Sequence, residues 1–61
     1  MPMIHVELYE GRTHQQKAEL AKAITQAVVD IAKATPESTH ILFTDVAKSN
    51  MAHGGILASD G

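Results

Sequence analysis

Cysteine is absent from this chain of 61 residues, which also contains only one tyrosine and one phenylalanine. The absence of cysteine excludes disulfides and every zinc site built from thiolates. A chain of this length forms one small domain, residues 1–61, and such a domain buries only about 60% of the surface that it exposes when unfolded. Because 44% of the residues are hydrophobic, the chain carries more aliphatic surface than it can cover alone, which favours a homo-oligomer.

Positive charge is scarce as well. Lysine and arginine together number 5 and the net charge is −2. The basic residues are scattered, so the phosphate attraction that nucleic-acid binding requires is missing. No stretch approaches the roughly 18 to 20 apolar residues that cross a bilayer, and the start of the chain lacks the charged and apolar regions of an export signal. We therefore expect a cytoplasmic protein with no nucleic-acid or membrane partner.

Two segments alternate with the period of a half-buried strand. In residues 3–9, apolar side chains fall on one face and polar side chains on the other. In residues 39–46, Ile41 and Phe43 share one face, and the content of β-branched and aromatic residues suits a strand. Both segments are predicted to be strands of a sheet with one covered face.

The segment between them has helical spacing. Thr13 and Gln16 have the separation of a capping box, and a helix of about 20 residues follows, which ends before Pro36 because the residue preceding a proline avoids the helical region. We expect Lys17 on the outer surface of this helix. The predicted apolar stripe contains Leu20, Ala21, Ile24, Ala27, Val28, Ile31 and Ala32.

The end of the chain completes the predicted fold. Gly54-Gly55 suggests a tight turn or small hairpin, followed by the apolar pair Ile56 and Leu57. A strand, a long helix and a second strand imply a right-handed parallel crossover. The expected fold class is α+β, a single β-α-β unit with a short C-terminal hairpin. One sheet face and both sheet edges are left unprotected, for which symmetric association is the expected remedy.

Two residues near the start of the chain suggest catalysis. Proline in second place permits removal of Met1, and the processed chain would begin with the secondary amine of Pro2, which can act as a base. Burial among apolar side chains and a neighbouring guanidinium would both disfavour the protonated amine. Arg12 presents the planar fork that binds a carboxylate through two hydrogen bonds. Taken singly, a proline that starts an edge strand and an arginine on the surface are the more common roles.

The other candidates give weaker signals. The four histidines have no metal-ligand spacing and no cysteine companions, so no metal site is predicted. Tyr9 and His40 are the polar residues that we expect near a pocket. Asp45 and Lys48 flank the end of the second strand and are interpreted as solvated loop charges.

Several of these features occur together in one known family. They are Met1-Pro2, Glu10-Gly11-Arg12-Thr13, Thr44-Asp45-Val46-Ala47-Lys48 and Gly54-Gly55-Ile56-Leu57-Ala58-Ser59. Across essentially its whole length, the chain resembles 4-oxalocrotonate tautomerase and its small relatives. The combination is specific although each element alone is weak.

The resemblance implies both an assembly and a mechanism. The expected assembly is a dimer with a four-stranded sheet and two helices, built further into a trimer of dimers. Pro2 corresponds to the catalytic base of the family, which moves a proton along a conjugated acid without a metal or organic cofactor. Arg12 corresponds to the arginine that holds a substrate carboxylate and draws electron density away from the reacting carbons.

Two positions depart from the family. Where the diacid tautomerase has a second arginine, contributed by another subunit, this chain has His40, and an imidazole polarises a carbonyl less strongly than a guanidinium. The aromatic residue that lines the family's pocket is replaced by Met51, which is apolar but flexible. The predicted substrate-binding residues are therefore Arg12, His40, Tyr9 and Met51, with altered activity expected on the dicarboxylate substrate.

Three functions remain open at this point. The first is a keto-enol isomerase for small unsaturated, 2-hydroxydienoate or 2-oxo acids, with Pro2 as general base and Arg12 as carboxylate anchor. The second is another reaction that depends on Pro2, such as hydration or decarboxylation of a small acid. The third is an oligomeric binding protein without catalytic activity.

Overall fold

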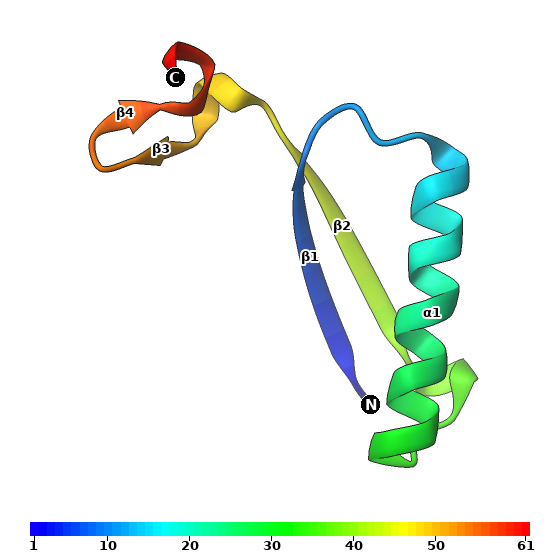
Figure 1. Ribbon diagram of the computed structural model, residues 1–61. Coiled ribbons are helices and arrows are strands. Elements are labelled where there is room, and N and C mark those ends of the chain that lie inside the picture. Colours follow the sequence, from blue (N-terminus) through cyan, green and yellow to red (C-terminus); the bar gives the residue numbers. More distant parts are fainter.

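The computed structural model describes all 61 residues and shows a two-stranded sheet, a helix along one of its faces, and an arm that extends away from both (Figure 1). The elements are β1 (Met3–Tyr9), α1 (His14–Ala32), η1 (Pro36–Ser38), β2 (His40–Val46), η2 (Lys48–Asn50), β3 (Ala52–His53), β4 (Ile56–Leu57) and η3 (Ala58–Asp60). This order matches the strand, helix, strand and hairpin that the sequence predicts.

β1 and β2 pair in parallel, with a register that runs from Met3 opposite His40 to Tyr9 opposite Val46. The predicted parallel crossover is therefore confirmed. The second strand begins one residue later than predicted, because the amide of Thr39 donates instead to the carbonyl of Pro36 in the short helix η1. Each strand keeps one edge without a partner.

The predicted capping box is present at the start of α1. Thr13 Oγ1 accepts a hydrogen bond from the Gln16 amide at 3.1 Å, and Gln16 Oε1 accepts one from the Thr13 amide at 2.9 Å. Two of the helix's otherwise unpaired amides are satisfied in this way. At the other end, Lys33 adopts a left-handed conformation with φ of 60°, which ends the helix before Pro36 as predicted.

Helix α1 lies along one face of the sheet (Figure 1), and both elements contribute half-buried apolar side chains. The side chains that contribute are Ile4, Val6, Leu8, Leu20, Ala21, Ile24, Val28, Ile41 and Phe43. Ile31, which the sequence places in the apolar stripe, is instead 82% exposed. It lies in the last turn of α1, one residue before the helix ends at Ala32.

An ion pair joins the helix to the sheet. Lys17 is half-buried, and its Nζ lies 2.8 Å from the carboxylate of Asp45. Asp45 was expected in a solvated loop, but it lies in β2, where 47% of its side chain is exposed. Lys17 was expected on the outer surface, and only 28% of its side chain is exposed. Asp45 alternates with Ile41 and Phe43 along β2 and so faces α1, where the aliphatic stem of Lys17 packs while its ammonium group reaches the carboxylate.

The arm begins after β2 and ends in the predicted hairpin. Ala52 pairs with Leu57 and His53 with Ile56, while Gly54 and Gly55 both have positive φ, at 61° and 85°. Positive φ at both central residues defines the type I′ turn that two-residue hairpins prefer. The arm is held to itself, since the Ala58 amide donates to the Met51 carbonyl at 2.8 Å, and it extends away from the sheet (Figure 1).

No residue of the isolated chain is buried. Large apolar side chains are exposed on the uncovered sheet face and on the arm, among them Met3 (53%), Leu42 (52%) and Ile56 (60%). No helix is both long and apolar enough to cross a membrane. Hydrophobic stabilisation scales with the apolar area removed from water, so the chain alone forms only part of a core.

The capping box provides a test of local stability. Replacing Thr13 by alanine removes the hydrogen bond to the Gln16 amide, and we expect the free energy of unfolding to fall by about 1 kcal/mol. Chemical denaturation at a fixed protomer concentration measures this change. The control is Lys22→Ala on the exposed surface of α1, expected to stay within about 0.5 kcal/mol; equal losses in both variants would contradict the role of the cap.

Candidate active site

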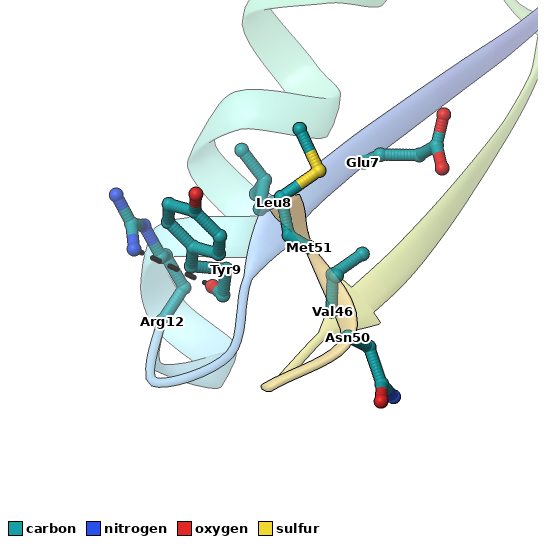
Figure 2. A pocket seen from close by; sticks show the side chains of 7 residues that line it. All are labelled: Glu7, Leu8, Tyr9, Arg12, Val46, Asn50 and Met51. Carbon is teal, nitrogen blue, oxygen red and sulfur yellow. Dashed lines mark hydrogen bonds between the residues drawn. The ribbon is translucent and has the colours of Figure 1, made fainter. Parts of the chain in front are cut away.

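A hollow of about 570 Å³ lies where β1 ends and the arm begins (Figure 2). Its lining combines apolar surface with one carboxylate, one phenol, one amide and one guanidinium. The lining residues are Glu7, Leu8, Tyr9, Arg12, Val46, Asn50 and Met51. Three of the predicted site residues, Tyr9, Arg12 and Met51, are therefore brought together.

Arg12 stands at the edge of the hollow with most of its hydrogen-bonding capacity free. One guanidinium nitrogen donates to the carbonyl oxygen of Tyr9 at 3.4 Å, the contact drawn in Figure 2. The only ion pair in the chain is the one between Lys17 and Asp45, so no carboxylate neutralises Arg12. A guanidinium with free donors beside an apolar hollow is suited to bind a carboxylate from outside.

Tyr9 contacts two cations. Its backbone carbonyl accepts the hydrogen bond from Arg12, while the ammonium group of Lys48 lies 5.9 Å from the centroid of its ring. A cation over a tyrosine face at this distance is attracted by the ring quadrupole. Lys48, interpreted from the sequence as a solvated loop charge, thus contacts a residue of the hollow.

Pro2 and His40 lie at the opposite end of the sheet. The His40 amide donates to the Pro2 carbonyl at 3.0 Å, just before the register position at which Met3 faces His40. The seven residues of β1 span about 20 Å at the usual rise of a strand. A single chain therefore does not bring Pro2 next to Arg12, although the sequence argument treats them as neighbours.

The side chain of His40 is held by its own loop. Its Nδ1 lies 3.2 Å from the carbonyl oxygen of Ser38. A carbonyl can only accept, so a hydrogen bond here requires a proton on Nδ1. Nε2 is then the ring nitrogen left to contact other groups. No group of three or more histidine, aspartate or glutamate residues in the structure is arranged to hold a metal ion.

The hollow also contains residues that the sequence argument did not select. Glu7 alternates with Tyr9 on the uncovered face of β1, so the period of the strand was a signal that could have identified it. Asn50 has no comparable signal, because only the turn of η2 brings it to the end of β2. Met51 follows directly and supplies the apolar surface predicted for it.

Comparison with known proteins decides the family. The sequence model of the family described as tautomerase enzyme matches residues 2–61. The chain belongs to the tautomerase family. A probable tautomerase of Lactococcus lactis is 44% identical over 55 residues, which cover 90% of each chain.

Solved structures of tautomerase homologues have the same fold. YwhB, a homologue of 4-oxalocrotonate tautomerase, superposes with a TM-score of 0.95 at 32% identity, and the match covers 98% of both chains. A heterohexameric 4-oxalocrotonate tautomerase of Chloroflexus aurantiacus superposes with a TM-score of 0.91 at 27% identity, over 98% of this chain and 97% of the other. The predicted α+β tautomerase fold, a β-α-β unit with a short hairpin, is therefore confirmed.

The backbone before Arg12 provides a test of how this tautomerase positions its cation. Gly11 has φ of 115°, and a Cβ atom added there would meet nothing within 4 Å, so Gly11→Ala introduces backbone strain without a clash. We expect the free energy of unfolding to fall by about 1 to 2 kcal/mol in chemical denaturation.

Gly61→Ala is the matched control for this substitution. Gly61 has no positive φ, and its added Cβ would lie 4.0 Å from the Leu57 carbonyl oxygen, an ordinary contact. If Gly11→Ala were as stable as Gly61→Ala, the positive φ at residue 11 would not require a glycine in the turn before Arg12.

Proposed function

We propose that this tautomerase-family enzyme is a cofactor-independent keto-enol isomerase for small unsaturated, 2-hydroxydienoate or 2-oxo acids. The observation that carries the proposal is the hollow at which Arg12, the only arginine of the chain, presents an unpaired guanidinium. Pro2 is the general base and Arg12 the carboxylate anchor. Tyr9 and Met51 shape the pocket, and His40 is a polar contact for the substrate.

The base requires removal of Met1. In the unprocessed chain the nitrogen of Pro2 belongs to a peptide bond and has no basicity. Met1 is 81% exposed and precedes a small residue, so it is accessible to an aminopeptidase. The region that matches the family begins at Pro2, which supports a mature chain with a terminal proline.

The proton transfer needs only groups of the protein. The uncharged amine of Pro2 takes a proton from the enol hydroxyl or an acidic carbon of the substrate, and the protonated amine returns one to a distant carbon of the conjugated system. The Arg12 guanidinium holds the carboxylate and favours the negative charge that develops on the substrate between these two steps. No bond to the protein forms, and the proton count of Pro2 is restored.

A second chain must complete the site, because Pro2 and Arg12 lie at opposite ends of β1. The edge of β1 that does not pair with β2 is open along its whole length. Antiparallel pairing of two such edges about a two-fold axis would place Pro2 of one chain at the Arg12 end of the other. The result is the dimer with four strands and two helices that the family resemblance implies.

Further association accounts for the remaining exposed surface. The uncovered sheet face with Met3 and Leu42, and the arm with Ile56 and Leu57, expose apolar side chains that one dimer sheet leaves uncovered. The Chloroflexus relative is a heterohexamer, so six-chain assembly exists within the family. We propose a homohexamer, a trimer of dimers, for this chain.

The proposed base is tested by mass and by rate. We expect the intact mass of the native protein to be lower than that of the full sequence by one methionine. Ultraviolet spectroscopy should then show catalysed ketonisation of a dienol diacid or an enol monoacid. In Pro2→Ala we expect the rate constant kcat to fall by at least about 100-fold, the usual contribution of a general base.

Each of these outcomes separates the competing functions. A native chain that retains Met1 would rule out every mechanism with Pro2 as the base. A processed chain that accelerates neither ketonisation would favour hydration, decarboxylation or a purely binding role. If the enzyme catalyses ketonisation and Pro2→Ala leaves kcat unchanged, the protein is an isomerase but Pro2 is not its general base.

Whether each active site is formed by two chains can be tested by mixing two inactive variants. If Pro2 and Arg12 of each site come from different chains, co-refolding Pro2→Ala with Arg12→Ala creates some sites with both residues intact. Random assortment restores about one quarter of the wild-type activity. Separately refolded variants mixed at the end are the control, and activity that never exceeds theirs would place both residues of each site on one chain.

A further inference from the structure

We propose that Lys48 is the second cation of this active site and binds the distal carboxylate of a dicarboxylate substrate. The inference rests on the proposed function, because it assigns the substrate class of the same hollow. At the position where the family resemblance implies a second arginine this chain has His40, so a dianionic substrate would need its second permanent positive charge from another side chain.

The other basic side chains are occupied or distant. Arg12 is the only arginine and serves the first carboxylate. Lys17 is paired with Asp45 at 2.8 Å. Lys22 is on the exposed surface of α1, and Lys33 follows the far end of that helix, opposite the hollow (Figure 1). Among the four lysines, only Lys48 makes a cation-π contact with a lining residue, Tyr9.

The position of Lys48 suits this role. It begins η2, the short helix whose last residue, Asn50, lines the hollow. Its ammonium group lies 5.9 Å from the centroid of the Tyr9 ring, while Arg12 donates to the backbone carbonyl of the same tyrosine. The two cations therefore both contact Tyr9, one at its ring and the other at its backbone carbonyl.

Charge balance requires a second cation. The lining contains one positive and one negative side chain, Arg12 and Glu7, so the hollow without Lys48 offers a dianion no net attraction. Lys48 forms no ion pair, since the only ion pair in the chain joins Lys17 to Asp45. Its contact with Tyr9 is a weak cation-π interaction, and the flexible four-carbon stem allows it to be exchanged for a charge-assisted hydrogen bond.

Binding of two acids with the same carbon skeleton tests the proposal. Adipate is a saturated six-carbon diacid and hexanoate the corresponding monoacid, and neither can be turned over. Isothermal titration of the processed wild-type protein should show tighter binding of adipate than of hexanoate. In Lys48→Gln we expect the dissociation constant for adipate to rise about tenfold, the usual effect of losing a hydrogen bond to a charged group, and that for hexanoate to stay unchanged.

Two further variants separate charge from structure. Lys48→Arg should retain the preference for adipate, and Lys22→Gln, which removes an exposed lysine remote from the hollow, should bind both acids like the wild type. If Lys48→Gln weakens both acids equally, the lysine only positions Tyr9 and the proposal is overturned. It is also overturned if Lys48→Gln changes neither constant, or if the wild type binds adipate no better than hexanoate.

These readouts are independent of turnover. If the ketonisation assays fail but Lys48→Gln selectively loses adipate, the isomerase proposal is rejected while the role of Lys48 stands. If ketonisation succeeds without any preference for the diacid, Lys48 is excluded and the isomerase stands.

Discussion

The parallel pairing of β1 with β2 determines where the functional groups of this protein lie. The register from Met3 opposite His40 to Tyr9 opposite Val46 sets Pro2 and His40 at one end of the sheet and the Arg12 hollow at the other. Because a strand is extended and stiff, seven residues are enough to separate the proposed base from the proposed anchor by about 20 Å. The proposed catalysis consequently depends on the proposed association, since a single chain does not bring Pro2 and Arg12 together.

The exposed apolar surface of the isolated chain also favours association with other chains. The isolated chain buries no residue and exposes Leu42, Ile56 and other large aliphatic side chains, so one helix on a two-stranded sheet leaves these side chains in contact with water. Association would remove that surface and bring the two half-sites together in the same step. For an obligate oligomer, stability is inseparable from protomer concentration, and here the same would hold for catalytic competence.

Much of the fold could be predicted because its signals are local. The alternation in residues 3–9, the Thr13 and Gln16 capping box and the Gly54-Gly55 turn each depend on short-range geometry, and all three are observed. The errors concern residues whose surroundings are set by other elements. Lys17 and Asp45 look like unrelated charges in the sequence, and their ion pair forms only because β2 lies against α1.

The sequence by itself determined the elements, the tautomerase family and the identity of the chemical groups. Side-chain periodicity and capping are properties of neighbouring residues, and a proline in second place and a single arginine can be recognised without coordinates. Only the tertiary structure decided how these groups are distributed in space. It united Arg12, Tyr9 and Met51, added Lys48 to them, and placed Pro2 at the far end of the sheet, because strand register and the path of the arm are set by contacts between residues remote in sequence.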